Sequence, residues 1–488
     1  MDRRCFLTSL AAATSVHLAS AQQRAMPQVE PFKPSEGLNS PIGAGKGINP
    51  GRVVWLRDAD STSWDGKTGF WWDDANTNQR IVDRMTSRLL LLLTGQKNDK
   101  QAWDALFRDF NEKHQRGNSG HRRGEKIAIK INGNQDRGPD WTNMVRSFGG
   151  GRGPGGGAPA GAPPGGGPGG PPPGGGASAG NPAAAAGRAG GPPRAPQNGF
   201  TSPHVVSALV SQLIDVAGVP GEDIMVYEAL DNHNIGQPIF AKVRGNPSRD
   251  FQAVRFLAGN DFGHGGRVKP TVDKDNPVQF SKEGVPTAYL PREVVESTYY
   301  INLAQLRAHT MAGVTLSGKN HFGSLHFPGV GWTPSPLHSY ITRTLPMGSY
   351  SVLVDLLGHQ HLGGKTMLFM LDGIYSAEHN EGNAYRWASF GDDWASSLLM
   401  SQDPVALDSV GLDILRNEPR ATEVRGNADN YMHEAAQAGK PPSGTVYNPD
   451  GRGALAGLGV HEHWNNPTDK KYSRNLGSKQ GIELIASV

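Results

Sequence analysis

The feature that most constrains the fold is a strand–helix–strand pattern that a long insertion divides. Residues 127–132 alternate isoleucine with other side chains, and residues 224–228 form a second short apolar segment, so both are expected to be strands. Residues 202–217 indicate a helix, because a hydroxyl cap precedes Pro203 in the first turn. A helix between two such strands is typical of parallel pairing. The pattern predicts an α/β fold with an open, mostly parallel sheet flanked by helices.

The insertion consists almost entirely of glycine, proline and alanine. It spans residues 149–196, and its only charged residues are Arg152, Arg188 and Arg194. Such a composition cannot bury enough apolar surface to offset the entropy lost on ordering. Because the strand–helix pattern resumes directly after it, we expect a disordered insertion within one α/β domain and not a linker between two domains.

The rest of the chain extends the α/β pattern toward both ends. Further strands are expected at 52–56, 299–303 and 365–371, and further helices at 78–94, at 100–111, within 337–357 and at 404–415. The expected organisation is a signal peptide at 1–21, an irregular segment at 22–51, a main α/β domain at 52–148 and 197–424, the insertion at 149–196 and a loop-rich C-terminal extension at 425–488.

The first residues predict export. Arg3 and Arg4 form a twin-arginine pattern, a modest apolar segment follows, and residues 19–21 offer a cleavage site that ends at Ala21. The twin-arginine machinery exports folded proteins, often with a cofactor bound. We therefore expect a periplasmic or extracellular protein after removal of the signal near Ala21. The alternative is an ordinary cytosolic terminus.

Composition excludes several classes of function. The chain has one cysteine, Cys5, which would leave with the signal, so a disulfide, an iron–sulfur cluster and a thiol nucleophile are not expected. The formal net charge is only +3, which argues against nucleic-acid partners. No later stretch reaches the length of a membrane span, and we expect none in the mature chain.

The segment 299–324 predicts a binding loop. It begins as an apolar strand and then becomes polar between Gly313, Gly318 and Gly323. Its polar side chains are Arg307, His309, Thr310, Thr315, Ser317, Lys319, Asn320 and His321. Cations, hydroxyls and amides between glycines suit a loop whose backbone approaches an anionic or polar ligand. The alternative is a polar loop that satisfies its own backbone.

Strand ends supply the other candidate binding residues. Lys130 and Asn132 lie at the end of strand 127–132, where ligands usually bind in open α/β sheets, and Thr201 opens the following helix. A lysine there can meet a phosphate or carboxylate, although an exposed sheet edge is the alternative. The expected substrate-binding residues are Lys130, Asn132, Thr201, His309, Lys319 and Asn320.

Three carboxylates are candidates for acid–base catalysis. Asp372 follows an apolar strand, and Asp403 and Asp408 lie at the start of the helix expected at 404–415. We expect Asp372 to converge with Lys130, Lys319 and Asn320 at one pocket, because strand ends in an open α/β sheet lie along the same edge.

Histidines cluster in a way that indicates a divalent metal as one candidate cofactor. Seven of the 16 histidines lie between His309 and His379. The candidate ligands are His321, Glu378, His379, His461 and His463. His461 and His463 could share one face of a strand as half of a zinc site, although packing beside Trp464 is the alternative. His433 does not begin a metalloprotease motif, because Gln437 stands where the second histidine belongs.

Several of these segments together resemble a known family. They are IKIN at 129–132, TSPHVV at 201–206, INLAQLRAHTMAGVTLSGKN at 301–320, Asp372-Gly373 and SQDPVALD at 401–408. In this order the chain resembles the uncharacterised family called domain of unknown function 362, over about residues 124–415. The resemblance implies an α/β fold and names no reaction. The family often has lysine where this chain has Arg307, and some relatives carry ferredoxin cysteines that this chain lacks.

Two classes of function fit these features. The first is an exported enzyme that acts on an anionic or metal-associated small substrate in a Lys/Asn/His/Asp pocket at the strand ends. The second is a non-catalytic ligand- or metal-binding protein of the periplasm that uses the same pocket. A perturbed carboxylate or a stoichiometric metal would favour the enzyme, whereas tight binding without turnover would favour the second class.

Overall fold

The computed structural model describes residues 37–133, 199–231, 233, 235–260, 265–380 and 382–488. The predicted signal peptide and the Gly/Pro/Ala insertion lie outside these residues. In the described part of the chain, no helix has the length and hydropathy needed to cross a membrane.

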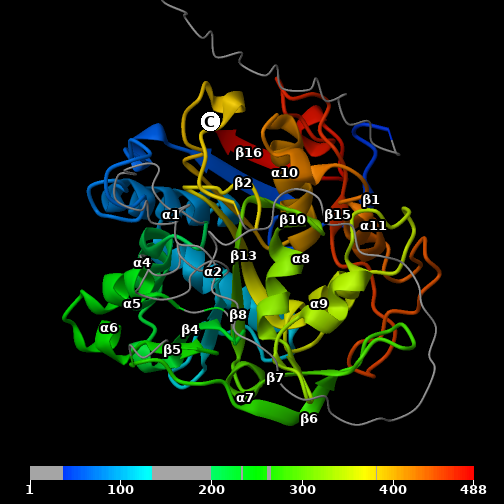
Figure 1. Cartoon of the computed structure of the whole chain (residues 1–488), viewed down its shortest axis with the longest axis horizontal. Coiled ribbons are helices and arrows are strands. Elements are labelled where there is room, and N and C mark those ends of the chain that lie inside the picture. Colours follow the sequence, from blue (N-terminus) through cyan, green and yellow to red (C-terminus); the bar gives the residue numbers. More distant parts are fainter. Residues whose placement is uncertain (1–36, 134–198, 232, 234, 261–264, 381) are drawn as a thin grey trace, which may run out of the picture. The chain divides into compact units, whose positions relative to one another are not determined.

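A mixed sheet of eight strands forms the centre of the fold (Figure 1). Its strands are β2 Arg52–Arg57, β3 Ile127–Lys130, β4 Ile224–Glu228, β5 Arg255–Ala258, β8 Tyr299–Gln305, β13 Thr366–Gly373, β14 Ser397–Ser401 and β16 Glu483–Ser487. They are ordered β16-β2-β14-β13-β8-β3-β4-β5. Only β14 pairs antiparallel with its neighbours, so the sheet is mostly parallel. The predicted α/β fold class is confirmed.

Helices cover both faces of this sheet. They are α1 Gln79–Thr94, α2 Asp99–Lys113, α4 Pro203–Ser211, α5 Gln237–Arg244, α6 Arg249–Ala253, α7 Arg292–Val295, α8 Ser317–Asn320, α9 Val352–Gly358, α10 Pro404–Asn417 and α11 Asn430–Ala436. Figure 1 shows α1, α4 and α5 on one side and α8 to α11 on the other. The two faces form two apolar cores, because alternate strand residues point to opposite faces: Ile127 and Ile129 join one core, and Ala128 joins the other.

The predicted βαβ unit is present as β3, α4 and β4. The helix starts at the expected position with Pro203 in its first turn, and a π-helical segment, Gln212–Val216, continues it. The expected hydroxyl cap is wrong, because the Ser202 side chain makes no capping hydrogen bond. The Asp372 carboxylate accepts a hydrogen bond from the Ser202 backbone N–H instead, at 2.6 Å. A carboxylate from a distant strand therefore satisfies the helix start.

The segment 337–357 does not form one helix. It contains a 3-10 helix, Ser335–Tyr340, and the short helix α9. Pro346 and Gly348 separate them, and Gly348 has a φ of +76°, which lies in the left-handed region. A proline and a left-handed glycine end a helical path that apolar spacing alone suggests.

Three smaller pairings complete the fold. A four-stranded antiparallel sheet contains β6 Val272–Val278, β7 Ala288–Pro291, β11 His326–Phe327 and β12 Gly331–Trp332. The hairpin of β9 Arg307–His309 and β10 Gly313–Thr315 follows β8. The strand β1 Ile42–Gly43 pairs with β15 Val460–His461. The C-terminal stretch contributes β15 and also β16, the edge strand of the main sheet beside β2.

Candidate functional site

Polar residues meet where three parallel strands end. β3 ends at Lys130 and β4 at Glu228, and β3 pairs in parallel with both β4 and β8. The segment after β8 returns to this edge, because Asn320 of α8 donates hydrogen bonds to the Lys130 carbonyl at 3.3 Å and to the Asn302 side chain at 2.8 Å. These contacts place α8 and its Lys319 at the carboxyl end of β3, beside the middle of β8. This edge is the usual ligand-binding position in open α/β sheets.

Three cations are buried at this edge. Lys130 and Arg307 are fully buried, and Lys319 is 9% exposed. Burial, with the charges of Arg307 and Lys130, lowers the pKa of Lys319 to about 7. Burial also lowers the pKa of Arg307 to about 9. The Lys319 ammonium lies 3.8 Å from the centroid of the Phe322 ring, a cation–π contact.

Glu228 is the carboxylate that compensates one of these cations. It accepts hydrogen bonds from Lys130 Nζ at 3.1 Å and from the Gly133 backbone N–H at 3.0 Å. Burial raises the pKa of Glu228, but Lys130 outweighs this and holds it at about 2. Glu228 is therefore ionised at neutral pH, and Lys130 is neutralised by it.

Within the described part of the chain, Arg307 and Lys319 have no such carboxylate partner. Arg307 donates to the Gly199 carbonyl at 2.6 Å and to Asn132 Oδ1 at 3.1 Å, which are both uncharged acceptors. Among the described residues, no carboxylate lies within ion-pair distance of Arg307 or Lys319. The site therefore carries buried positive charge that the described part of the protein does not neutralise.

His309 adds a neutral donor to the cations. Its Nδ1 accepts hydrogen bonds from the backbone N–H groups of Met311 at 3.1 Å and Ala312 at 3.2 Å. In a neutral imidazole, Nε2 must then carry the proton. Burial, with the charges of Lys319 and Arg307, holds the pKa of His309 well below its usual value. His309 is neutral at physiological pH and offers an N–H donor.

Asn132 and Thr201 organise the backbone of the site. The Asn132 backbone N–H donates to Thr201 Oγ1 at 2.8 Å, and the Asn132 amide oxygen accepts from Arg307. Asp372 occupies the start of α4 with its own carboxylate, which also accepts from the Ile374 N–H at 3.0 Å. Burial raises the pKa of Asp372 to about 6. The helix start that we expected to bind a substrate anion thus already binds a carboxylate of the protein.

Asp403 and Asp408 lie in hydrogen-bond networks with backbone groups. Asp403 caps α10 through the Ala406 N–H at 2.9 Å and also accepts from Lys46 N–H at 2.8 Å and Val460 N–H at 3.2 Å. Burial raises the pKa of Asp403 to about 7. Its contacts join the N-terminal segment and the C-terminal segment to α10.

Asp408 holds the loop that carries Lys319. It accepts hydrogen bonds from the N–H groups of Ser317 at 2.9 Å and Gly318 at 3.0 Å, and from the Tyr431 hydroxyl at 2.8 Å. Burial raises the pKa of Asp408 to about 6. This geometry gives Asp408 a clear positioning role for α8.

The histidine His321 forms a buried network beside α8. Its Nδ1 lies 3.4 Å from the Tyr300 hydroxyl, and its Nε2 lies 3.2 Å from the Asn302 amide nitrogen. Burial lowers the pKa of His321 to about 3, so the ring is neutral. Glu378 is exposed and His379 is half-buried. In the described residues, these three side chains do not form a cluster of metal ligands.

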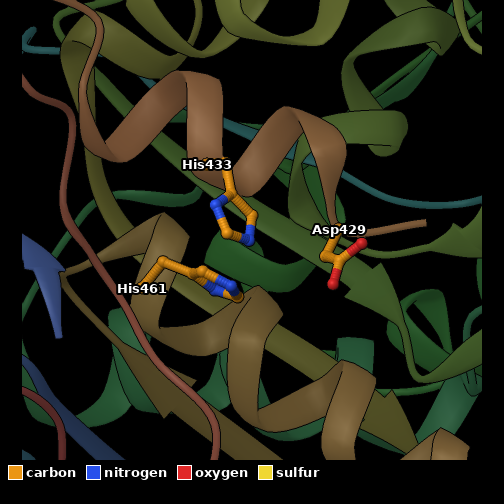
Figure 2. Close-up of side chains that lie close together, drawn as sticks. All are labelled: Asp429, His433 and His461. Atoms are coloured by element: carbon orange, nitrogen blue, oxygen red, sulfur yellow. The ribbon is translucent and has the colours of Figure 1, made fainter. Parts of the chain in front are cut away.

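The group of ligands that does cluster is Asp429, His433 and His461 (Figure 2). One ligand atom of each residue lies within 4.8 Å of the others, so the group could hold a metal ion. His461, which was predicted as a metal ligand, lies in this group, whereas Asp429 and His433 were not predicted as ligands. Their spacing of four residues on one helix was the available signal, because it places two side chains on the same face.

Comparison with known proteins gives one family. Residues 192–413 match the family described as Domain of unknown function (DUF362). The matched segment contains Arg307, Lys319, Asp372 and Asp408, whereas Lys130 precedes it. A search of curated proteins found no match.

Proposed function

We propose that the protein, whose residues 192–413 match the family described as Domain of unknown function (DUF362), is an enzyme that binds a small anionic substrate. The proposed site is the sheet edge at the ends of β3, β4 and β8. The substrate class is a carboxylate or a phosphate ester, because both match the charge and the donors of this edge.

The observation that carries this proposal is the buried charge of Arg307 and Lys319. Removing a cation from water costs several kcal/mol unless an opposite charge accompanies it. Glu228 pairs with Lys130, and no described carboxylate lies within ion-pair distance of the other two. A bound anion would neutralise them, and the His309 N–H would donate a hydrogen bond to it.

Lys319 is the residue that we propose for proton transfer. With a pKa of about 7, its amine is partly unprotonated at neutral pH. Lysines whose pKa values burial lowers in this way can act as general bases, and an anion beside them raises the pKa again. Lys319 would therefore take up a proton when the substrate binds and then be able to donate it as a general acid.

The three carboxylates considered for catalysis take other parts in this proposal. Asp408 and Asp403 are positioning residues, because they accept backbone hydrogen bonds that fix α8 and α10. Asp372 supports the start of α4. Because these three carboxylates already accept hydrogen bonds from the protein, acid–base chemistry would depend on Lys319 alone. This favours the alternative function, a binding protein without turnover.

Binding of simple anions tests the proposal. The probes are inorganic phosphate, sulfate and malonate, measured by equilibrium dialysis against the purified protein. Lys319→Met and Arg307→Met should each weaken binding by at least about tenfold, since loss of one buried charge partner costs about 2–5 kcal/mol. Lys282→Met is the matched control, because Lys282 also lies near aromatic rings, those of Tyr340 and Tyr350, but outside this site.

The result for the control decides the interpretation. Binding that Lys282→Met retains and Lys319→Met loses supports the site. Equal binding by wild type and Lys319→Met would reject it.

We also propose that the precursor is exported by the twin-arginine route and that the mature protein acts in the periplasm or outside the cell. Arg3, Arg4 and the small residues that end at Ala21 support this proposal. Export in the folded state would allow a bound metal to travel with the protein.

A further inference from the structure

A second cluster of polar side chains lies between α10, α11 and β15, and the proposed anion site does not use it. Asp429, His433 and His461 are 2%, 8% and 0% exposed, respectively. Figure 2 shows His433 and His461 facing each other, with Asp429 beside them at the start of α11. The His433 and His461 ring centroids are 4.5 Å apart.

Local structure explains why these residues meet. Asp429 is the N-cap residue of α11 and His433 follows four positions later, so both lie on one face of the helix. His461 lies in β15, where it pairs with Ile42 of β1. The Leu458 N–H donates to the Ala435 carbonyl at 2.9 Å, which holds the chain before β15 against α11.

A hydrogen bond orients the His461 ring. Its Nδ1 lies 2.7 Å from Ser409 Oγ, and that hydroxyl also lies 2.6 Å from the Val405 carbonyl oxygen. The carbonyl can only accept, so a Ser409 hydroxyl that donates to it must accept from the His461 Nδ1–H. Nε2 is then unprotonated, as a nitrogen ligand of a metal must be. Metal-binding histidines are held in this way by a partner on the other ring nitrogen.

His463 shows the same arrangement with a carboxylate. Its Nδ1 lies 2.6 Å from Asp413 Oδ1, and its Nε2 lies 3.6 Å from Asp429 Oδ2. The Asp413 carboxylate also accepts hydrogen bonds from the Trp464 N–H at 3.1 Å and the Tyr472 hydroxyl at 2.8 Å. A fixed carboxylate behind an imidazole is the usual support of a metal-ligating histidine.

The charges of the cluster favour a cation. Asp413 and Asp429 are buried, and Arg416 lies 3.1 Å from Asp429. Two carboxylates and one guanidinium leave one negative charge beside the buried histidines.

We propose that Asp429, His433 and His461 bind a divalent first-row transition metal, such as zinc, with His463 as a fourth ligand. Two or three imidazoles with one carboxylate match the ligand preferences of zinc and related ions. Calcium and magnesium prefer oxygen ligands, so they match this donor set poorly. Because the ligands are buried, the metal is structural and fastens β15 to α11.

The metal site also contacts the network that supports the anion site. Tyr431 lies in α11 between Asp429 and His433, and its hydroxyl donates to Asp408. Asp408 in turn holds Ser317 and Gly318, next to Lys319. A metal on α11 would stabilise this chain of contacts. The metal proposal does not depend on the proposed function, because its readouts are metal content and stability.

The competing arrangement is an ion network without metal. In that network a protonated His463 would bridge Asp413 and Asp429. It would bind no transition metal, and chelators would not change its stability. Titration of the whole protein with metal therefore separates the two.

The experiment uses full-length protein, purified after expression, stripped with a chelator and titrated with Zn²⁺ and Co²⁺. We expect one equivalent of metal per chain, a higher thermal midpoint with metal, and visible absorption from Co²⁺ bound by nitrogen and oxygen ligands. Absence of both the midpoint shift and the Co²⁺ absorption in the wild-type protein would overturn the proposal, whatever the variants do.

Variants assign the site to these residues. His433→Ala and His461→Ala should lose the Co²⁺ absorption, whereas His361→Ala, a histidine outside the cluster, should keep it. Ser409→Ala removes only one hydroxyl and tests the support of His461 with little disturbance of packing. We expect it to weaken metal binding by about 10-fold to 100-fold. Unchanged affinity in folded His461→Ala protein would also overturn the assignment.

Discussion

Lys319 is the residue whose charge the fold accommodates least well. Burial and two neighbouring cations lower its pKa to about 7, whereas an unfolded lysine has a pKa of 10.5. A buried ammonium without a described carboxylate partner lowers the unfolding free energy of the protein unless a ligand supplies the opposite charge. This imbalance distinguishes Lys319 from Lys130, which Glu228 neutralises.

The pH dependence of stability should report this imbalance. Between about pH 7 and pH 10, folded protein binds fewer protons at Lys319 than unfolded protein does, so the unfolding free energy rises with pH. The unfolding free energy of wild type minus that of Lys319→Met should therefore increase over this range by more than about 1 kcal/mol. Urea denaturation in phosphate-free buffer measures it. A pH-independent difference would show that Lys319 is not perturbed.

At the residue scale, some of the site could be predicted and some could not. Lys130 and Lys319 could be placed at one edge, because each follows an apolar strand and parallel strands end together. The bond between Asp408 and the Ser317 N–H could not, because it joins segments 91 residues apart. The Glu228–Lys130 pair could not be predicted for the same reason, because its residues are 98 positions apart.

The element that brings Lys319 into place is α8 with the 3-10 helix after it, His321–Ser324. Gly323 in this turn lies against the ion pair of the sheet edge. A Cβ atom at Gly323 would lie 2.3 Å from both Lys130 Nζ and Glu228 Oε1, closer than such atoms can approach. The glycine is needed here for close approach between the turn and the strand ends.

Gly323→Ala should therefore disturb the site through its packing. We expect it to reduce phosphate affinity by at least about tenfold, which corresponds to about 1.4 kcal/mol. Gly439→Ala is the matched control, because its Cβ would meet only an ordinary contact of 3.5 Å with the Leu455 carbonyl. Equilibrium dialysis of both variants makes the comparison. Retained phosphate binding by Gly323→Ala would show that the turn does not shape the site.

Elements with strong local signals were predicted well. The helix start at Pro404 has an aspartate cap, and β13 is a continuous apolar run that ends in Asp372 and Gly373. The helix expected within 337–357 is present as the short α9, which begins only after Pro346 and the left-handed Gly348. The grouping of Asp429 and His433 with His461 could not be predicted, because His461 is placed by the pairing of β15 with β1, which are distant in the sequence.

At the scale of the whole molecule, export is the property that the N-terminal sequence predicts. Replacing Arg3 and Arg4 together by lysine should leave the precursor in the cytoplasm, because the twin-arginine route requires the arginine pair. Arg24→Lys, beyond the expected cleavage site, should be exported like wild type. Cell fractionation with immunoblotting measures the outcome. Normal export of the double variant would reject the twin-arginine route.

In the part of the molecule that the structure describes, the sheet-edge cations and the Asp429 cluster are two buried polar sites linked through α11 and Asp408. Counting the described residues alone, the first has no carboxylate at ion-pair distance from Lys319 and Arg307, and the second has two carboxylates, Asp413 and Asp429, and the guanidinium of Arg416. The link runs from Tyr431 through Asp408 to the Ser317 N–H. Metal binding at one site would therefore support the loop that forms the other.

The most direct test of the anion site is proton uptake on binding, measured by isothermal titration calorimetry. Phosphate, sulfate and malonate are each titrated into wild type and Lys319→Met near pH 7, in two buffers of different ionisation enthalpy. An anion raises the pKa of Lys319 from about 7, so wild-type protein should take up protons and its binding heats should differ between the buffers. With sulfate, which does not itself titrate near pH 7, Lys319→Met should show no such uptake. Equal heats in both buffers for the wild-type protein, or no saturable binding of any of the three anions, would contradict the account.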